Sequence, residues 1–146
     1  MDFETSVNRA IYQSFVHRGA APTVDEVAAR LEVDRGAVAE AYRSLASQRV
    51  LVLQDDGESI RMALPFSGIP TQHQVEVEGR HYFANCAWDA LGIPAALHQT
   101  GVVTSRCEQS REPLRLEVGL DGPEPSPWLF HCLVPAAKWW DDVVFT

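Results

Sequence analysis

The apolar residues change their spacing partway along the chain, and this change constrains the fold more than any other feature. Before residue 50 they recur every three to four positions, which is the spacing of the buried face of an α-helix. Further on they alternate with polar residues, as Val75 and Val77 do with Glu76 and Glu78, a pattern typical of β-strands. The order of the two patterns predicts an α+β fold, with an N-terminal helical lobe followed by a mainly β lobe.

The first 64 residues contain three helical segments and then a hairpin. Thr23 and Glu26 stand three positions apart at the start of the second segment, which is the spacing of a capping box. Asp56 and Gly57 separate two apolar runs, so a tight turn between two strands is expected there. Three helices and a hairpin in this order predict a winged-helix-like domain over residues 1–64. The apolar stripes of the three helices are Val7, Ala10, Ile11 and Phe15; Val24, Val27, Ala28 and Leu31; and Val38, Ala41, Tyr42 and Leu45.

The charges of this domain disfavour DNA binding. The candidate recognition helix, residues 35–48, carries Arg35 and Arg43 but also Glu40, and the wing "QDDGES" carries three acids. Phosphate contacts need positive charge, whereas the chain as a whole has a formal net charge of −8. We therefore predict that nucleic acid is not a partner. A weakly DNA-binding regulator remains the alternative.

A second domain is expected over residues 65–146, because the proline- and glycine-rich segment "PFSGIPTQ" reads as a linker. The mainly β composition of this domain follows from its short apolar runs and turn residues. The expected elements are a hairpin over 73–84, a short helix after it, two strands over 100–120, a strand over 128–135 and a helix from residue 136.

Several classes of protein are excluded by composition and spacing. No apolar run has the length of a membrane span, and the first residues, "MDFETSVNR", are not a signal peptide, so a cytoplasmic protein is expected. Three cysteines, an odd number, do not form a disulfide framework. The histidines lack zinc-site spacing, and His131 and Cys132 would point to opposite faces of one strand.

The short helix of the second domain is expected to begin at Asn85 or Cys86 and to be interrupted at Gly92 and Pro94. Cys86 and Asp89 are i and i+3 residues on this helix, so their side chains should share one face. Unpaired amides and the helix dipole in the first turn favour a thiolate, which predicts a lowered pKa for Cys86. Apolar neighbours should make the Asp89 carboxyl hold its proton more readily.

This pair of groups has a chemical and a structural interpretation. A thiolate is a soft-metal ligand and a carboxylic acid is a proton donor, so together they could break a carbon–metal bond: the sulfur holds the metal and the acid protonates the leaving carbon. In the structural interpretation Cys86 is a buried cysteine, a common occurrence, and Asp89 is an acid favoured by the helix dipole.

The segment "YFANCAWDALGIPAALH" resembles the active-site segment of the organomercurial (alkylmercury) lyase family. The matching residues are Tyr82, the run C-A-W-D-A-L from Cys86 to Leu91, and Pro94-Ala95. The resemblance continues through "VVTSRCEQSREPLRLEV", where Cys107 matches a structural cysteine, and the family also carries a winged-helix-like lobe. It implies that Cys86 is the first mercury-binding thiol and Asp89 the proton-handling acid. It further implies that no cofactor is required, and that Hg²⁺ or another soft metal is substrate or product.

The family uses a second catalytic cysteine, which the resemblance leads us to expect directly after Thr146. The sequence is then either a fragment or a shortened relative, and Cys132 is the other candidate metal ligand. A repurposed biosynthetic enzyme of the lyase family and a non-catalytic soft-metal or thiol-reactive sensor remain alternatives. The apolar run "VVFT" suggests a homodimer or a partner chain at the C-terminal edge.

Overall fold

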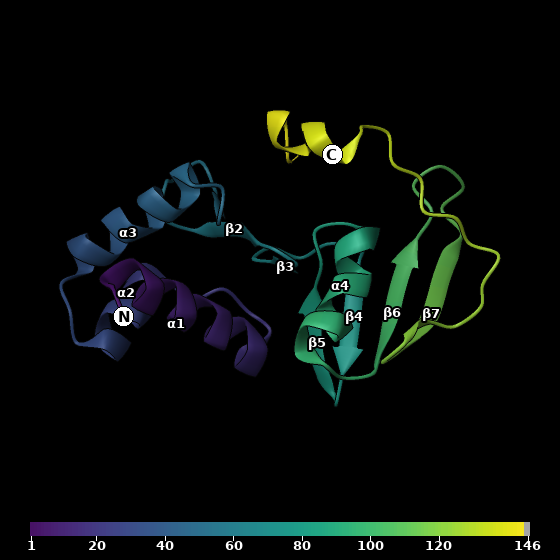
Figure 1. Cartoon of the computed structure of the whole chain (residues 1–146), viewed down its shortest axis with the longest axis horizontal. Helices are drawn as coiled ribbons and strands as arrows, with labels where there is room; N and C mark the ends of the chain where they lie inside the picture. Colours follow the sequence, from purple (N-terminus) through teal and green to yellow (C-terminus); the bar gives the residue numbers. More distant parts are fainter. Residues whose placement is uncertain (145–146) are drawn as a thin grey trace.

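The computed structural model describes residues 1–144, which form two lobes side by side (Figure 1). The first lobe is mainly helical, and the second is built on a five-stranded sheet, so the predicted α+β fold is confirmed. The helices are α1 (Phe3–Arg18), α2 (Val24–Leu31), α3 (Arg35–Ser47), α4 (Ala87–Leu97) and the 3₁₀-helix η1 (Ala136–Asp141). The strands are β1 (Val52–Leu53), β2 (Ile60–Ala63), β3 (Phe66–Ser67), β4 (Gln74–Val77), β5 (Arg80–Phe83), β6 (Gly101–Arg106), β7 (Pro113–Gly119) and β8 (Gly122–Pro123).

Local side-chain caps begin the three helices of the first lobe. The Asp2 carboxylate accepts from the Thr5 backbone N–H at 2.9 Å at the start of α1. The predicted capping box is present at α2: Glu26 N–H donates to the Thr23 hydroxyl at 3.1 Å, and Thr23 N–H donates to the Glu26 carboxylate at 2.8 Å. α3 begins at Asp34 in the same way as α1. These caps depend on residues three positions apart, which is why the sequence predicts them.

The predicted linker after the first lobe contains a strand that belongs to the first sheet. β3 pairs antiparallel with β2, and the sheet order is β1-β2-β3. Phe66 in β3 is only 2% exposed, because it packs into the hydrophobic core. The helices and the β1–β2 hairpin follow the predicted order, while the assignment to the winged-helix class stays a prediction.

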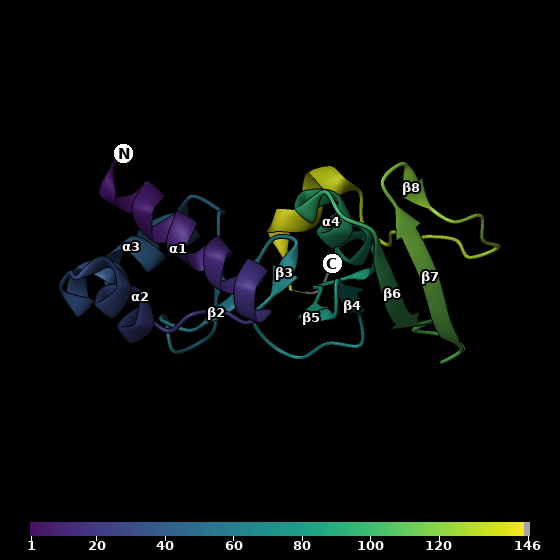
Figure 2. The same cartoon turned by 90° about the horizontal axis from the view of Figure 1, so that it is seen from below.

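The second lobe is an antiparallel sheet of order β5-β4-β6-β7-β8, with α4 packed on one of its faces (Figure 2). The β4–β5 hairpin turns at Glu78 and Gly79, both of which have positive φ angles, as the glycine at the turn predicts. α4 runs without interruption past Gly92 and Pro94, so the predicted break is wrong. The apolar helix is held by packing on the sheet, where Ile93 and Pro94 are buried, and this packing outweighs the proline's cost.

One hydrophobic core extends through both lobes. Its centre is Phe66, whose ring stacks on Phe15 of α1 with centroids 5.1 Å apart and lies 5.6 Å from the Tyr82 ring of β5. The Tyr82 hydroxyl donates to the Val16 carbonyl at 3.0 Å. A bridge between Phe66 and Ala84 joins the backbones. The start of α4 is thus anchored directly against the first lobe.

The C-terminal part differs most from expectation. The strand predicted over residues 128–135 is absent: this stretch is irregular, and Leu129 is 92% exposed. The chain instead crosses back over α4 towards the first lobe (Figure 1), where Arg49 lies over the Trp140 ring at 5.9 Å. The helix expected from residue 136 is the 3₁₀-helix η1, and the "VVFT" run extends outside the described residues.

Within residues 1–144, no helix is both long enough and apolar enough to cross a membrane.

Candidate functional site

α4 begins at Cys86, which is the N-cap residue with an extended backbone conformation. Its carbonyl accepts the first helical hydrogen bond, from the Ala90 N–H at 3.0 Å. Asp89 lies in the first turn, at the third helical position, close enough to Cys86 for the charges of the two groups to interact. The structure therefore brings together the thiol and the carboxyl that the sequence singles out.

The pKa of the Cys86 thiol is raised, not lowered as the helix position predicts. Burial of the half-buried side chain is the largest cause, and the nearby Asp89 carboxylate acts in the same direction. The backbone N–H groups of Trp88 and Asp89 lower the pKa, but neither makes a capping hydrogen bond to the side chain. The prediction from the helix dipole is wrong here because it took no account of desolvation.

Burial also raises the pKa of Asp89, in agreement with the sequence expectation. The carboxylate accepts one side-chain hydrogen bond, from Asn85, which lowers the pKa but does not outweigh burial. The Asp89 carboxyl thus keeps its proton more readily than a free aspartate does.

Asn85 is a site residue for which sequence reasoning gave only a possible role as N-cap. The N-cap is Cys86 instead, and the Asn85 side-chain amide donates to Asp89 Oδ2 at 3.0 Å, to the Phe66 carbonyl at 3.1 Å and to the Pro65 carbonyl at 3.4 Å. Among the described residues, its buried Oδ1 has no hydrogen-bond partner. An unpaired buried acceptor costs about 1–3 kcal/mol. No sequence signal indicates these contacts, because two of them cross to the residues around β3.

Cys132 approaches Cys86 through the C-terminal segment. The Phe130 ring lies 5.6 Å from the Trp88 ring of α4, and the charge of Cys132 contributes to the raised pKa of Cys86. Cys132 is exposed, and its Sγ donates to the Val134 carbonyl at 3.0 Å. Within residues 1–144 no group of three or more His, Cys, Asp or Glu side chains is placed to hold a metal ion. The Cys86 thiol and the Asp89 carboxyl thus lie together at the start of α4, and Cys132 is near enough for its charge to affect the pKa of Cys86.

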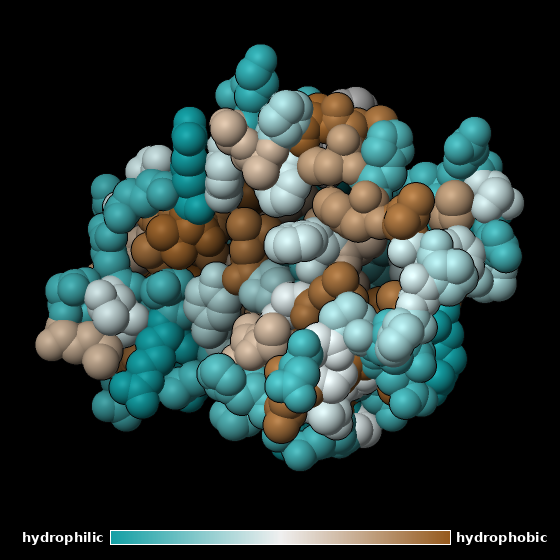
Figure 3. Space-filling model, turned by 45° about the vertical axis from the view of Figure 1, so that its right-hand side comes forward, coloured by the Kyte–Doolittle hydropathy of each residue, from teal (hydrophilic) through white to brown (hydrophobic). Residues whose placement is uncertain are grey.

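Apolar side chains are exposed around this site. On the face of the molecule shown in Figure 3, brown apolar patches are separated by hydrophilic side chains. The exposed apolar side chains of α4 and the segment that crosses it are Trp88, Leu129, Phe130 and Leu133.

Cys107 belongs to a different region, the turn between β6 and β7. The hydroxyl and backbone N–H of Ser110, together with the Gln109 N–H, lower the pKa of its thiol. The Ser110 N–H donates to Cys107 Sγ at 3.5 Å. This thiol is thus stabilised as a thiolate by its own turn.

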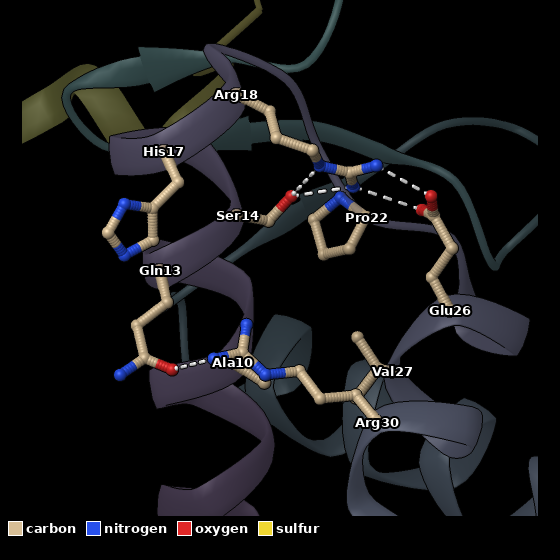
Figure 4. A pocket seen from close by; sticks show the side chains of 9 residues that line it. All are labelled: Ala10, Gln13, Ser14, His17, Arg18, Pro22, Glu26, Val27 and Arg30. Carbon is tan, nitrogen blue, oxygen red and sulfur yellow. Dashed lines mark hydrogen bonds and ion pairs between the residues drawn. The ribbon is translucent and has the colours of Figure 1, made fainter.

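A cavity of about 200 Å³ lies between α1 and α2, away from Cys86 (Figure 4). Five of its polar side chains are paired with one another: Arg18 donates to Glu26 at 2.7 Å and to Ser14 at 2.7 Å, and Arg30 donates to Gln13 at 2.5 Å. Because these hydrogen-bonding groups already have partners, the cavity offers no comparable set of reactive groups.

The basic residues of α3 are also occupied. Arg35 pairs with Glu58 at 2.5 Å and with Asp25 at 3.1 Å, and Arg43 lies 3.7 Å from Glu58. Glu58 belongs to the loop between β1 and β2, the predicted wing. These ion pairs take up charge that a DNA phosphate would need.

The structure thus places the Cys86 thiol and the Asp89 carboxyl at the start of a helix that packs against an antiparallel sheet. The family model described as alkylmercury lyase matches residues 66–146. The chain belongs to the alkylmercury lyase family, which confirms the resemblance of its sequence.

Individual relatives show the same likeness. The chain is 31% identical to an alkylmercury lyase of Bacillus cereus over 101 residues, 67% of this chain and 45% of the relative. It is 37% identical to an alkylmercury lyase of Pseudomonas putida over 71 residues, 47% of this chain and 34% of the relative. The crystal structure of the mercury-bound form of MerB2 matches with a TM-score of 0.66 and 27% identity, over 85% of this chain and 59% of that one. The chain spans half or less of the length of these two relatives.

Proposed function

We propose that this chain cleaves the carbon–mercury bond of organomercurials, with Cys86 as the mercury ligand and Asp89 as the proton carrier. The observation that carries the proposal is the placement of the Cys86 thiol and the half-buried Asp89 carboxyl together at the start of α4. Burial raises the pKa of both groups, which agrees with this proposal. A soft ligand and an acid that keeps its proton are the two groups that protonolysis requires. Family membership supports the same substrate class.

The reaction balances with the groups present. The Cys86 thiol displaces the ligand X of R–Hg–X to form Cys86–S–Hg–R, and the thiol proton passes to the Asp89 carboxylate while X⁻ leaves. The protonated Asp89 then delivers this proton to the carbon. The electron pair of the C–Hg bond forms the C–H bond of the product R–H, and Hg(II) stays on the Cys86 sulfur. The raised pKa of Cys86 favours the thiol from which the first step begins. The raised pKa of Asp89 makes its carboxylate a better acceptor of the thiol proton and favours the neutral acid from which the second step begins.

After cleavage the mercury on Cys86 carries a positive charge and needs a second ligand. The Asp89 carboxylate is one such ligand. In our proposal the Cys132 thiolate is another such ligand, because mercury is a soft metal and prefers sulfur. The electrostatic effect of Cys132 on the pKa of Cys86 supports this role. In this role Cys132 would hold the product ion rather than take part in the proton transfer.

The test is a single-turnover cleavage assay on the full chain with a phenylmercury salt, in which benzene is measured by gas chromatography. We expect benzene from the parent chain and none from Cys86→Ser. Asp89→Asn should still bind phenylmercury at Cys86 but release benzene about 10²–10⁴-fold more slowly, because general acid catalysis contributes this much. Cys107→Ser is the matched control, since its thiol lies in the β6–β7 turn, and it should cleave at the parent rate.

Two results would count against the proposal. Normal turnover by the Asp89→Asn variant would remove Asp89 from the mechanism. Stoichiometric phenylmercury binding by the parent without benzene would instead favour a soft-metal or thiol-reactive sensor.

A further inference from the structure

We propose that Asn85 is a positioning residue that decides which oxygen of Asp89 carries the proton. The inference rests on the proposed function, because it gives Asp89 a proton to deliver. It concerns a residue that contributes no reacting atom. Three observations support it: the orientation of the Asn85 amide, the oxygen of Asp89 that it contacts, and the unpaired oxygen of Asn85 itself.

The orientation of the amide follows from its partners. The Asn85 side-chain nitrogen lies 3.1 Å from the Phe66 carbonyl oxygen and 3.4 Å from the Pro65 carbonyl oxygen. Carbonyl oxygens only accept hydrogen bonds, so the nitrogen of the amide, and not its oxygen, must face them. A flipped amide would place oxygen against oxygen. One N–H of Asn85 is thus directed to the backbone around β3, and the other remains for Asp89.

This orientation distinguishes the two oxygens of Asp89. Oδ2 accepts the N–H of Asn85 at 3.0 Å. In a neutral carboxyl the carbonyl oxygen is a better acceptor than the hydroxyl oxygen, so the N–H at Oδ2 favours the form with the proton on Oδ1. Oδ1 is therefore the oxygen that takes the thiol proton and returns it to the substrate carbon. The same hydrogen bond favours the ionised carboxylate and so opposes the effect of burial, which helps Asp89 to release the proton.

The other ionisable groups around Asp89 do not perform this task. Cys86 faces it from the start of α4 and interacts through its charge. Tyr12 faces it from α1, and the Asp89 charge together with burial raises the pKa of this phenol. The Tyr12 hydroxyl donates to the Leu64 carbonyl at 3.0 Å, so its proton is already engaged.

The unpaired oxygen of Asn85 supports a functional role. Asn85 Oδ1 is buried and has no hydrogen-bond partner among residues 1–144. The residue is not the N-cap of α4. All three acceptors of the amide face its nitrogen, so the oxygen is left without a partner. Such a cost in stability is common at functional sites.

The test is a pH titration of the Asp89 carboxyl, monitored by ¹³C NMR on protein labelled at the aspartate carboxyl carbons. The resonance of Asp89 is assigned by its absence from the spectrum of Asp89→Asn. In Asn85→Ala the pKa of Asp89 should rise above that of the parent chain. The rate of phenylmercury cleavage should fall about 10- to 100-fold, the equivalent of one hydrogen bond to a charged group. An unchanged Asp89 titration in this variant would overturn the proposal.

Thr71→Val is the matched control. The Thr71 hydroxyl donates to the Ala84 carbonyl at 2.6 Å, directly before Asn85, so this variant also loses a tie to the same segment. It has no contact with Asp89 in the described hydrogen bonds, and its Asp89 titration should match that of the parent. A shift in Thr71→Val equal to that in Asn85→Ala would show a general structural effect and would overturn the proposal.

A measurement on the unaltered chain covers the case in which Asn85→Ala does not fold. The ¹⁵N and ¹H resonances of the Asn85 side-chain amide should shift with pH at the midpoint of the Asp89 titration, and this shift should disappear in Asp89→Asn. Amide resonances that do not follow Asp89 would overturn the inference. A parent chain that shows the coupling but releases no benzene would support the role of Asn85 and overturn the proposed function, so the two failures are distinguishable.

Discussion

At the starts of α2 and α4, two polar side chains stand at the same positions of the helix. They cap the helix in α2, but not in α4. Thr23 and Glu26 occupy the N-cap and third positions of α2, and Cys86 and Asp89 occupy the same positions of α4. In α2 each side chain caps the backbone of the other, and Glu26 also binds Arg18. In α4 the Cys86 thiol makes no capping hydrogen bond, and the Asp89 carboxylate accepts a hydrogen bond from the Asn85 amide instead.

The pKa values reflect this difference. The Arg18 guanidinium and the capping hydrogen bonds lower the pKa of the exposed Glu26 to about 2, whereas burial raises the pKa of Asp89. The first pair uses its polar groups for stability. The second pair leaves a thiol and a proton donor uncommitted at some cost in stability, which is a common property of functional sites.

The first prediction concerns a substitution that gives α4 a side-chain cap like that of α2. In Cys86→Ser the hydroxyl should accept the Asp89 N–H as an N-cap, which typically stabilises a protein by about 0.5–2 kcal/mol. Cleavage of phenylmercury should be lost completely, because the soft ligand is gone. Urea denaturation and the benzene assay measure the two effects. A less stable serine variant would show that the thiol itself contributes to packing, and the contrast with α2 would fail.

The second prediction compares the two thiols of the second lobe. The pKa of Cys107 is lowered by its turn, and the pKa of Cys86 is raised by burial. Because the thiolate is the reactive form, Cys107 should react with iodoacetamide at pH 7 at least about tenfold faster than Cys86. Peptide mapping by mass spectrometry gives both rates. Faster labelling of Cys86 would mean that the helix dipole does control this thiol.

The third prediction concerns the cost of the buried acid. The pKa of Asp89 is raised in the folded state, so ionisation favours unfolding at pH values above the ordinary aspartate pKa of about 3.9. Asp89→Asn should therefore stabilise the chain by about 0.5–2 kcal/mol at pH 8, a range common for functional-site replacements. This gain should vanish near pH 3, where both states are protonated. Denaturation at the two pH values tests it, and an equal gain at both would refute a charge effect.

The fourth prediction has the smallest expected effect, and this effect is a loss of stability rather than a gain. Glu26→Gln keeps an amide able to cap α2 but loses the ion pair with Arg18. Both side chains are about half exposed, so solvent screening limits the expected loss at pH 7 to about 0.5 kcal/mol. The pKa of Glu26 is lowered, so its contribution is present above pH 4.5 and disappears as the pH falls towards 2. The difference between Glu26→Gln and the parent should shrink over this window in acid denaturation curves. If the difference in stability between the two proteins did not change with pH, the loss would come from the weakened cap of α2 and not from the ion pair.

The sequence by itself determined the features that depend on residues a few positions apart. The three N-terminal helices, the Thr23 capping box and the Gly79 hairpin follow from such spacings and are present in the structure. The C-x-x-D motif likewise placed a thiol and an acid at the start of one helix. These features are local, so neither burial nor long-range packing is needed to predict them.

Only the tertiary structure decided the features that depend on burial and on distant segments. Packing on the sheet carries α4 past Pro94, and desolvation reverses the predicted direction of the Cys86 pKa shift. The segment 128–135 is irregular instead of forming a strand, and its Phe130 ring lies against the Trp88 ring of α4. Asn85 reaches Asp89 with its amide fixed by carbonyls about 20 residues away in the chain. Sequence spacing cannot report such contacts, because they arise only when the two lobes close around one core.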